Sequence, residues 1–423
     1  MLWPHRTRRA VLAVVISTLA IAGATPMAMA ATTGGSKQAW AGKVITLGAV
    51  FSTTGTGVAY GPQQVKGARL AVSQINAAGG IKGAVVHLVI DNDDSQPAQS
   101  ALVMQSLITS HNVLAVLGPT FSNSAAAADP VANSLATPVL AVSNTGPGIV
   151  GSCAYPCSWI YRDSIGDATT IPANIGYYVK RAHPHAAVVM YPSADPFGMS
   201  TGQIASQAFT SGGVDQVSSV TVADPTALSG PVQTALAAHP NVVAITGSSA
   251  AVAGALIKEL RAQGFTGQIL GGNAFNSPTA ATAAGSAGIG ARSGAAWYVG
   301  NSSAVNRAFV SDYKRRYGTN PDQFAALAYT GVQLLARAAR SAPLKFSSTA
   351  ADRSALGGAL ARVRMNTPLG SFQFTPAHDV EQPIWLLAMN GKGGYRLVQQ
   401  LHFSPLDQRC HARSMTSAAT PGP

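Results

Sequence analysis

Short runs of apolar residues alternate along this chain with longer segments whose apolar residues are three or four positions apart. The first run, Val44–Phe51, predicts a strand. The segment 60–76 then places Val65, Val72 and Ile75 at helical spacing, and Gly79-Gly80 ends it. This succession of strand and helix repeats to about residue 270.

The repeat predicts the fold class. Further strands are expected at 85–90, 113–117, 138–142, 186–191, 217–222, 242–246 and 268–270. Helices are expected between them at 97–108, 122–135, 168–181, 201–209, 227–239 and 250–263. From Ser303 the order changes, and helices at 304–317, 322–340 and 350–362 precede strands at 369–374, 383–389 and 395–400. Near-continuous apolar strands are typical of parallel sheets buried on both faces, so we expect a doubly wound α/β fold with two similar lobes.

The first thirty residues have the pattern of an export signal. A basic start with Arg6, Arg8 and Arg9 leads into a short apolar run and then Ala28-Met29-Ala30. The run is shorter than a membrane span requires. We therefore expect a signal peptide over 1–30 and an extracytoplasmic mature protein, with twin-arginine export as an alternative route.

Composition and charge limit the partners. Hydrophobic residues make up 47% of the chain, and the net charge of +12 falls to +9 once the three signal arginines are removed. Lys and Arg are scattered, apart from Lys314-Arg315-Arg316 at a predicted helix end, where cations complement the helix dipole. No basic stripe is interleaved with aromatic residues, so we expect no nucleic acid partner.

The cysteines fit an oxidising compartment. Cys153 and Cys157 are four positions apart, which favours a local disulfide. A metal site is the alternative, although no His or third Cys flanks the pair at ligand spacing. Cys410, in the tail, is left without an assigned partner.

Several segments resemble known sites but fail in detail. Gly55–Gly61 is one residue off the dinucleotide-binding spacing, and Gly146–Gly151 has that spacing but does not open a helix. Asp91–Ser95 begins like a calcium loop, but Gln96 and Leu102 stand where Gly and Glu are required, so we expect a solvated loop. The chain has no G-x-S-x-G elbow. We expect no cofactor and no metal.

Loops at the carboxyl ends of strands are the better candidates, because open α/β sheets bind ligands there. Ser122 stands at a predicted helix start, where its hydroxyl and the free amides can hold a carboxylate. Ser143-Asn144-Thr145 follows the next strand and offers hydroxyl and amide groups. A simple helix cap and a simple turn remain equally open interpretations.

Further segments occur in a distinctive order. They are ITLGAVFSTTG with Tyr60-Gly61, KGARLAVSQINAAGGIKG, DNDDSQP, LGPTFS, TPVLAVSNT, Tyr161-Arg162, Gly264-Phe265 and TPLGSFQF. In this order they resemble the leucine/isoleucine/valine-binding type of solute-binding protein, over about residues 44–400. The resemblance implies the type I periplasmic-binding fold: two lobes joined by three crossover strands, with hinge closure around a ligand that is passed to a membrane ABC permease.

The resemblance also assigns binding residues. Tyr60, Ser122, Ser143 and Thr145 are expected to line the first lobe, where hydroxyls and amides hold a ligand carboxylate and the Ser143 carbonyl helps to hold an ammonium. Phe324 is expected to close the pocket beside the ligand side chain.

The second lobe departs from the family pattern. Phe197 and Ser249 match positions that are commonly aromatic, and Ser249 implies a roomier lobe. Asn273 matches the acid that pairs with the ligand ammonium, and a buried ammonium without a partner costs several kcal/mol. A neutral amide, a urea-like molecule or an organic carboxylate then competes with an amino acid as the ligand. Asp195 or another acid can compensate.

The expected protein is a monomeric binding protein and not an enzyme. Its expected parts are the signal 1–30, a leader 31–42, lobe 1 at 43–163 and 299–370, lobe 2 at 164–298 and 371–405, and a tail 406–423. Two alternatives stay open. One is a ligand-sensing receptor domain of the same fold, and the other is a secreted α/β hydrolase.

Overall fold

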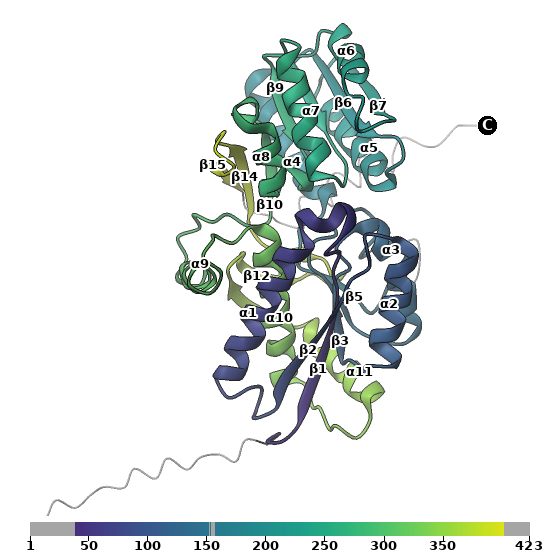
Figure 1. Cartoon of the computed structure of the whole chain (residues 1–423), viewed down its shortest axis with the longest axis vertical. Helices are drawn as coiled ribbons and strands as arrows, with labels where there is room; N and C mark the ends of the chain where they lie inside the picture. Colours follow the sequence, from purple (N-terminus) through teal and green to yellow (C-terminus); the bar gives the residue numbers. More distant parts are fainter. Residues whose placement is uncertain (1–38, 152, 154–156, 402–423) are drawn as a thin grey trace, which may run out of the picture. The chain divides into compact units, whose positions relative to one another are not determined.

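The computed structural model describes residues 39–151, 153 and 157–401 (Figure 1). The expected signal peptide (1–30), the leader up to residue 38, the tail (406–423) and Cys410 lie outside these residues. Within the described part of the chain the strands form three sheets, two of them large.

The first large sheet has five parallel strands in the order β2-β1-β3-β4-β5. They are β1 (Val44–Val50), β2 (Val85–Asp91), β3 (Ala115–Leu117), β4 (Val139–Ala141) and β5 (Ile160–Arg162). Successive residues of β1 point to opposite faces, so Ile45 and Leu47 join one buried cluster and Val50 joins another. The predicted parallel sheet with two buried faces is therefore present.

Helices cover both faces of this sheet (Figure 1). One side carries α1 (Gly61–Ala77), α9 (Ala304–Tyr317), α10 (Gln323–Ser341) and α11 (Thr349–Leu360), and the other carries α2 (Pro97–Thr109) and α3 (Ser122–Ser134). The short η1 (Gly55–Ala59) precedes α1. α1 and α10 approach so closely that a Cβ at Gly67 would lie 2.1 Å from the Ala325 carbonyl oxygen. Gly67 therefore permits the contact that anchors α10.

The second large sheet is mixed, in the order β15-β14-β10-β9-β8-β6-β7. Its strands are β6 (Ala186–Pro192), β7 (Gln216–Val222), β8 (Val242–Ile245), β9 (Gln268–Gly271), β10 (Arg292–Ala295), β14 (Ile384–Met389) and β15 (Tyr395–Leu401). β14 runs antiparallel to β10, and β15 runs antiparallel to β14. One face carries α4 (Asp167–Ala182) and α5 (Pro196–Ser211), and the other α6 (Ser229–Ala237), α7 (Ala250–Ala262), α8 (Pro278–Ala284) and η3 (Gly285–Gly288).

The chain passes between the two large sheets three times, at 163–166, 296–303 and 375–383. The last passage leaves from a small antiparallel sheet of β11 (Arg364–Thr367), β12 (Gly370–Phe374) and β13 (Val380–Glu381), and β13 lies within the passage itself. Phe372 and Phe374 of this small sheet belong to the core of the first large sheet. The predicted two-lobed α/β fold with three crossovers is confirmed.

Several short elements were not predicted, namely β5, α8, β10, β11 and β13. β10 shows the reason. Its sequence Arg-Ser-Gly-Ala lacks the β-branched residues that mark a strand, yet it is fully buried because β9 and β14 flank it. Tertiary position, not local propensity, makes it a strand.

The loop after β2 corrects one expectation. We expected Asp91–Ser95 to be solvated, but Asp93 is fully buried. Ser52 Oγ donates to its Oδ1 at 2.6 Å, and the Ser100 hydroxyl donates to its Oδ2. Asp93 therefore ties the loop after β1 to the start of α2, which positions the segment leading into α1.

Candidate functional site

A pocket lies where loops from the carboxyl ends of both large sheets meet. These loops follow β3 and β4 in the first sheet and β8 and β9 in the second. The cavity measures about 30 Å³, which is room for about two water molecules. A larger ligand therefore requires the two sides to separate before it enters. The lining is Tyr60, Thr120, Phe121, Ser122, Asn123, Ser143, Asn144, Thr145, Phe197, Gly247, Ser248, Asn273, Ala274 and Phe324.

The structure brings together all but one of the residues expected from the sequence. Ser249 does not line the pocket, because its hydroxyl accepts the Val252 N–H at 3.3 Å and caps α7. Gly247 and Ser248 form the wall at that point instead. A helix-cap serine looks the same in sequence as a pocket serine, so the pattern alone did not separate the two roles.

The start of α3 supplies hydrogen-bond donors to the pocket. Phe121 occupies the N-cap position and offers no side-chain cap, so the first amides of α3 stay open. Ser122 Oγ accepts the Gly146 N–H at 3.0 Å, and among the described residues its own proton has no acceptor. Open amides, a free hydroxyl proton and the positive end of a helix form a site suited to a carboxylate.

Ser143 is held by a chain of buried hydrogen bonds. Its Oγ accepts from Gln64 Nε2 at 2.9 Å and donates to the Thr120 carbonyl at 2.6 Å. Thr120 Oγ1 in turn donates to Gln64 Oε1 at 2.6 Å. The hydroxyl proton of Ser143 is therefore used in the bond to Thr120, and this hydroxyl can only accept a hydrogen bond from a ligand. Gln64 was missed by sequence reasoning, although a polar residue on the small-residue face of α1 was the available sign.

An acid lies directly behind Thr145. Thr145 Oγ1 donates to Asp167 Oδ2 at 2.9 Å, and Thr170 Oγ1 donates to Asp167 Oδ1 at 3.0 Å. Burial raises the pKa of Asp167 to about 6, while the hydrogen bonds from Thr145 and Thr170, the charge of Arg162 and the backbone N–H of Asn273 oppose the rise. At neutral pH the carboxyl group is ionised and accepts the hydrogen bond from Thr145 Oγ1. The Thr145 hydroxyl therefore presents only lone pairs to the pocket.

Asn273 begins the short helix η2 (Asn273–Asn276) and reaches across to the first sheet. Its Nδ2 donates to the Ser143 carbonyl at 3.2 Å, and its Oδ1 accepts from Gln323 Nε2 at 2.8 Å. Gln323 Oε1 is fixed in turn by the Ala296 N–H at 2.8 Å. The amide thus bridges the two sides where the family pattern places an acid.

Aromatic rings form the apolar part of the pocket. Tyr60 packs edge-on against Phe324 and Phe121, with ring centroids 4.6 Å and 5.6 Å away. Burial raises the pKa of Tyr60 above its ordinary value, and its hydroxyl donates to the Ser248 carbonyl at 2.8 Å. Phe197 adds a further ring. This surface suits an aliphatic or aromatic side chain.

Asp195, named as a possible substitute for the missing acid, is already committed. Its Oδ1 accepts from Asn123 Nδ2 at 3.0 Å, and its Oδ2 accepts from the Ser248 N–H at 2.7 Å. It lies beside the pocket and does not line it. Asp167, which was not predicted, also contacts the lining from behind, through Thr145.

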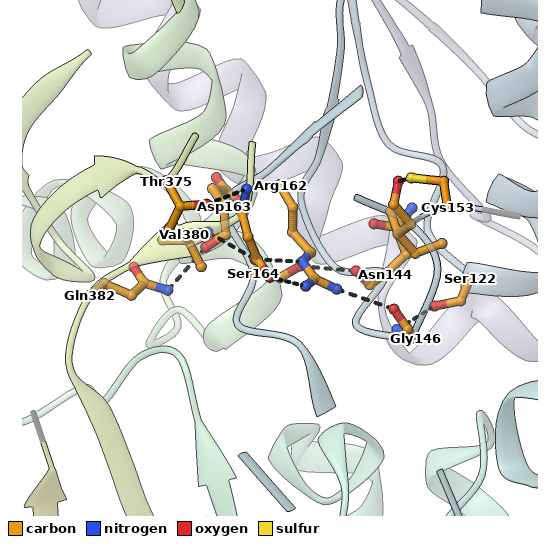
Figure 2. A network of polar contacts seen from close by, with 12 residues as sticks. Ser122, Asn144, Gly146, Cys153, Arg162, Asp163, Ser164, Thr375, Val380 and Gln382 are labelled. Carbon is orange, nitrogen blue, oxygen red and sulfur yellow. Dashed lines mark hydrogen bonds and ion pairs between the residues drawn. The ribbon is translucent and has the colours of Figure 1, made fainter. Parts of the chain in front are cut away.

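A polar network connects the pocket to the segments between the sheets (Figure 2). Arg162 Nη1 donates to the Gly146 carbonyl at 3.2 Å, and the Gly146 N–H reaches Ser122. The guanidinium also leaves no room for a side chain at Gly166, where a Cβ would lie 2.6 Å from Nη2. Arg162 thus positions both the pocket loop and the entry to α4.

The loop between β4 and β5 carries the expected disulfide. Cys153 and Cys157 are joined, with their Cα atoms 6.3 Å apart. Ile149 and Val150, just before the bridge, are buried in the α2–α3 core. The bridge therefore lies in the same loop as the pocket residues Ser143 to Thr145.

Neither a metal site nor a membrane-spanning helix is found in the part of the chain that the structure describes. Among residues 39–151, 153 and 157–401, no group of three or more His, Cys, Asp or Glu side chains is placed to hold a metal ion. In the same described residues, no helix is long and apolar enough to cross a bilayer.

Comparison with known proteins yields one family and several relatives. The model of a family described as periplasmic binding protein matches residues 44–394. The "Amino acid binding protein" of Pseudomonas aeruginosa is 30% identical over 105 residues, which is 25% of this chain and 28% of that protein. "Leu/Ile/Val-binding protein homolog 3" of Brucella melitensis is 27% identical over 252 residues, 59% of this chain and 66% of that protein. The matched part is thus less than two thirds of either relative.

Solved structures match over more of the chain. A branched-chain amino acid transporter substrate-binding protein from Streptococcus pneumoniae, in complex with isoleucine, has a TM-score of 0.74 at 25% identity, covering 86% of this chain and all of that one. A solute-binding protein of an ABC transporter from R. palustris, in complex with benzoate, has a TM-score of 0.73 at 22% identity, covering 84% and 96%. The second match shows a common fold.

Proposed function

This chain belongs to the periplasmic binding protein family, and from that membership we propose that it captures a small organic ligand between two lobes and delivers it to a membrane ABC importer. Members of this family are binding proteins that act outside the cytoplasm. The hydrolase alternative is therefore set aside. Residues 1–30 supply the export signal in this proposal, and the protein acts as a monomer.

The proposed lobes follow the sheets. Lobe 1 comprises 43–163 and 299–374, and lobe 2 comprises 164–298 and 375–405. The boundary expected at residue 370 moves to the end of β12, because Phe372 and Phe374 pack in the first core. The division is supported by the separation of β1–β5 from β6–β10 into different sheets, and by the return of α9, α10 and α11 to the first core.

The observation that carries the proposal is that one pocket offers hydrogen-bond donors at the start of α3, its donor end, and acceptors in the loop after β4, its acceptor end. Ser122 and the open amides of α3 offer donors, which suit a carboxylate. Thr145 and the Ser143 carbonyl offer acceptors, with Asp167 behind them, which suits an ammonium or amide N–H. Tyr60 and Phe324 add an apolar wall to the same pocket.

The proposed ligand is therefore a small carboxylate with an apolar body. Branched-chain amino acids and aromatic acids have this form, whereas the amide of a branched-chain amino acid keeps the apolar body and lacks the carboxylate. Tyr60, Ser122, Ser143, Thr145, Phe197, Asn273 and Phe324 are its proposed contacts. Because Asn273 is neutral, the negative charge facing an ammonium would come from Asp167 through Thr145.

A thermal-shift panel tests the proposal. L-leucine, L-isoleucine, leucinamide and benzoate are added separately, and a ligand at a hundred times its Kd raises the free energy of unfolding by about 2.7 kcal/mol. We expect a concentration-dependent rise for at least one carboxylate. Mass spectrometry of the purified protein extends the panel to compounds that co-purify. If neither the panel nor any co-purified compound shifts the transition, the proposed function is wrong.

A further inference from the structure

Helix α9 packs on α1 through one face and leaves the other in solvent. Phe309 and Tyr313 are buried, and Tyr313 Oη donates to Gln63 Oε1 at 2.7 Å. Tyr317 Oη donates to the Lys66 carbonyl at 2.8 Å. These contacts fix the rotation of α9 about its axis, so the residues on its opposite side face solvent.

The exposed surface of this helix pair is strongly basic, and it extends to the seam with α1, where Arg316 Nη1 donates to Ser73 Oγ at 3.1 Å. α1 and α9 together contain six basic residues, which we call the α9 basic face: Lys66, Arg69, Arg307, Lys314, Arg315 and Arg316. All are exposed except the half-buried Lys66, whose ammonium lies 5.8 Å from the Tyr317 ring centroid.

The two helices hold a single acidic residue, Asp312. Its carboxylate accepts from Gln74 Nε2 and from Arg315 Nη2, both at 2.7 Å. One acid against six bases leaves most of the positive charge uncompensated along these helices. Exposed charges within about 10 Å of one another act together at ordinary ionic strength.

We propose that the α9 basic face docks the protein onto an anionic phospholipid surface. Each Lys or Arg close to such a surface raises the partition of a protein onto it roughly five-fold, and these factors multiply. Val305, in the first turn of α9, is 39% exposed and adds an apolar group to the same helix, whose last turn carries Lys314, Arg315 and Arg316. The charge and the exposed valine together fit a bilayer surface.

A membrane surface also fits the proposed function. A reversible contact with an anionic bilayer is a means of keeping the protein near a membrane importer. This step rests on the proposed function, whereas the charge of the face does not. A nucleic acid fits less well, because Tyr313 and Tyr317 turn their hydroxyls toward α1 and leave no exposed ring on α9 for a base to stack on.

Vesicle sedimentation tests the proposal with the exported form of the protein, so that every variant has the same N-terminus. The vesicles contain phosphatidylcholine alone or equal parts of phosphatidylglycerol and phosphatidylcholine. We expect binding to the anionic vesicles only, falling as salt rises. The variant Lys314→Gln, Arg315→Gln, Arg316→Gln should lower the partition roughly 100-fold.

A matched control removes the same charge elsewhere. Lys180 of α4, Lys258 of α7 and Lys392 in the turn between β14 and β15 are exposed around the second sheet. Their replacement by Gln should change the partition less than five-fold. Circular dichroism melting curves check that each variant folds. The proposal would be overturned if the two triple variants lost vesicle binding equally, or if the protein bound both kinds of vesicle equally. It would also be overturned if a DNA duplex released the protein from the vesicles at a lower concentration of phosphate groups than phosphatidylglycerol vesicles do. A positive thermal-shift panel with no vesicle binding would refute this inference and leave the proposed function standing.

Discussion

Arg162 and Asp379 form a bidentate ion pair that joins two of the three segments connecting the sheets. Arg162 Nε donates to Asp379 Oδ1 at 3.0 Å, and Nη2 donates to Oδ2 at 2.5 Å. Arg162 ends β5, directly before the passage 163–166, and Asp379 lies within the passage 375–383. Because the same guanidinium holds Gly146, the pair links the connecting segments to the donor end of the pocket.

Replacing Asp379 by Asn is expected to weaken both stability and ligand binding. The Arg162 side chain is 7% exposed and would lose its charged partner, so the free energy of unfolding should fall by about 1–3 kcal/mol. Affinity for a carboxylate ligand should fall several-fold, because Gly146 and Ser122 lose their support. Urea denaturation and calorimetry measure the two effects.

The exposed pair His185–Asp215 provides the control for this change. Its side chains are 85% and 73% exposed, so Asp215→Asn should alter stability by less than about 0.5 kcal/mol and leave ligand affinity unchanged. Equal effects of the two substitutions would show that the Arg162 pair has no special role at the pocket.

Asp167 predicts a pH dependence of stability. The folded protein holds this proton up to a pH of about 6, whereas the unfolded chain loses it near its ordinary value of 3.8. The contribution of Asp167 is therefore fully present below pH 4 and is lost as pH rises through 6. The free energy of unfolding should fall by up to about 3 kcal/mol over this range.

Asp167→Asn isolates that contribution. Burial also raises the pKa of Asp322 to about 7, and it raises the pKa of Asp163 well above its ordinary value. Each of these groups makes the wild-type protein less stable as the pH rises, so the wild-type curve contains more than one contribution. The difference between the wild-type and Asp167→Asn curves should slope only between about pH 4 and 6. A flat difference would mean that Asp167 titrates equally in both states.

The sequence predicted the main parts of the pocket because their positions depend on strand ends. Ser122, Ser143 and Thr145 follow β3 and β4, and the carboxyl ends of parallel strands meet at one edge of a sheet. Ser249 follows β8 in the same way but turns into its own helix cap. A shift of one residue separates the two outcomes, and the pattern of apolar residues does not resolve it.

The supporting residues were less accessible to sequence reasoning. Gln64, Asp167 and Asp379 act through contacts that span 79, 22 and 217 positions of the chain. No local period or spacing encodes such contacts, because they form only when separate elements pack. The fold class depended on repetition along the whole chain and was therefore predictable, whereas these pairings were not.

Asn273→Asp tests the charge at the acceptor end of the pocket. The substitution keeps the size of the side chain and the bond from Gln323, but it replaces the donor to the Ser143 carbonyl with an oxygen. The unliganded protein should lose about 1–3 kcal/mol of stability. Binding of a zwitterionic amino acid should become at least about ten-fold tighter, because a charged partner strengthens the bond to its ammonium.

Benzoate provides the comparison for Asn273→Asp, since it lacks an ammonium. Its affinity should be unchanged or weaker in this variant, because the added negative charge offers it nothing. Calorimetry with leucine and benzoate gives both values. Weaker leucine binding in Asn273→Asp would place the ammonium elsewhere in the pocket.

Ser122→Ala and Ser249→Ala separate a pocket serine from a cap serine. Ser122 has a free hydroxyl proton at the donor end, so its loss should weaken a carboxylate ligand by about 10-fold to 100-fold, the value of a hydrogen bond to a charged group. Ser249 caps α7 outside the lining, so its loss should cost about 1 kcal/mol of stability and leave affinity unchanged. Thermal melts and calorimetry on both variants give the four values. The two variants remove the same hydroxyl, and only that of Ser122 contacts the pocket. If Ser249→Ala weakened binding as much as Ser122→Ala, the donor end would not lie at α3.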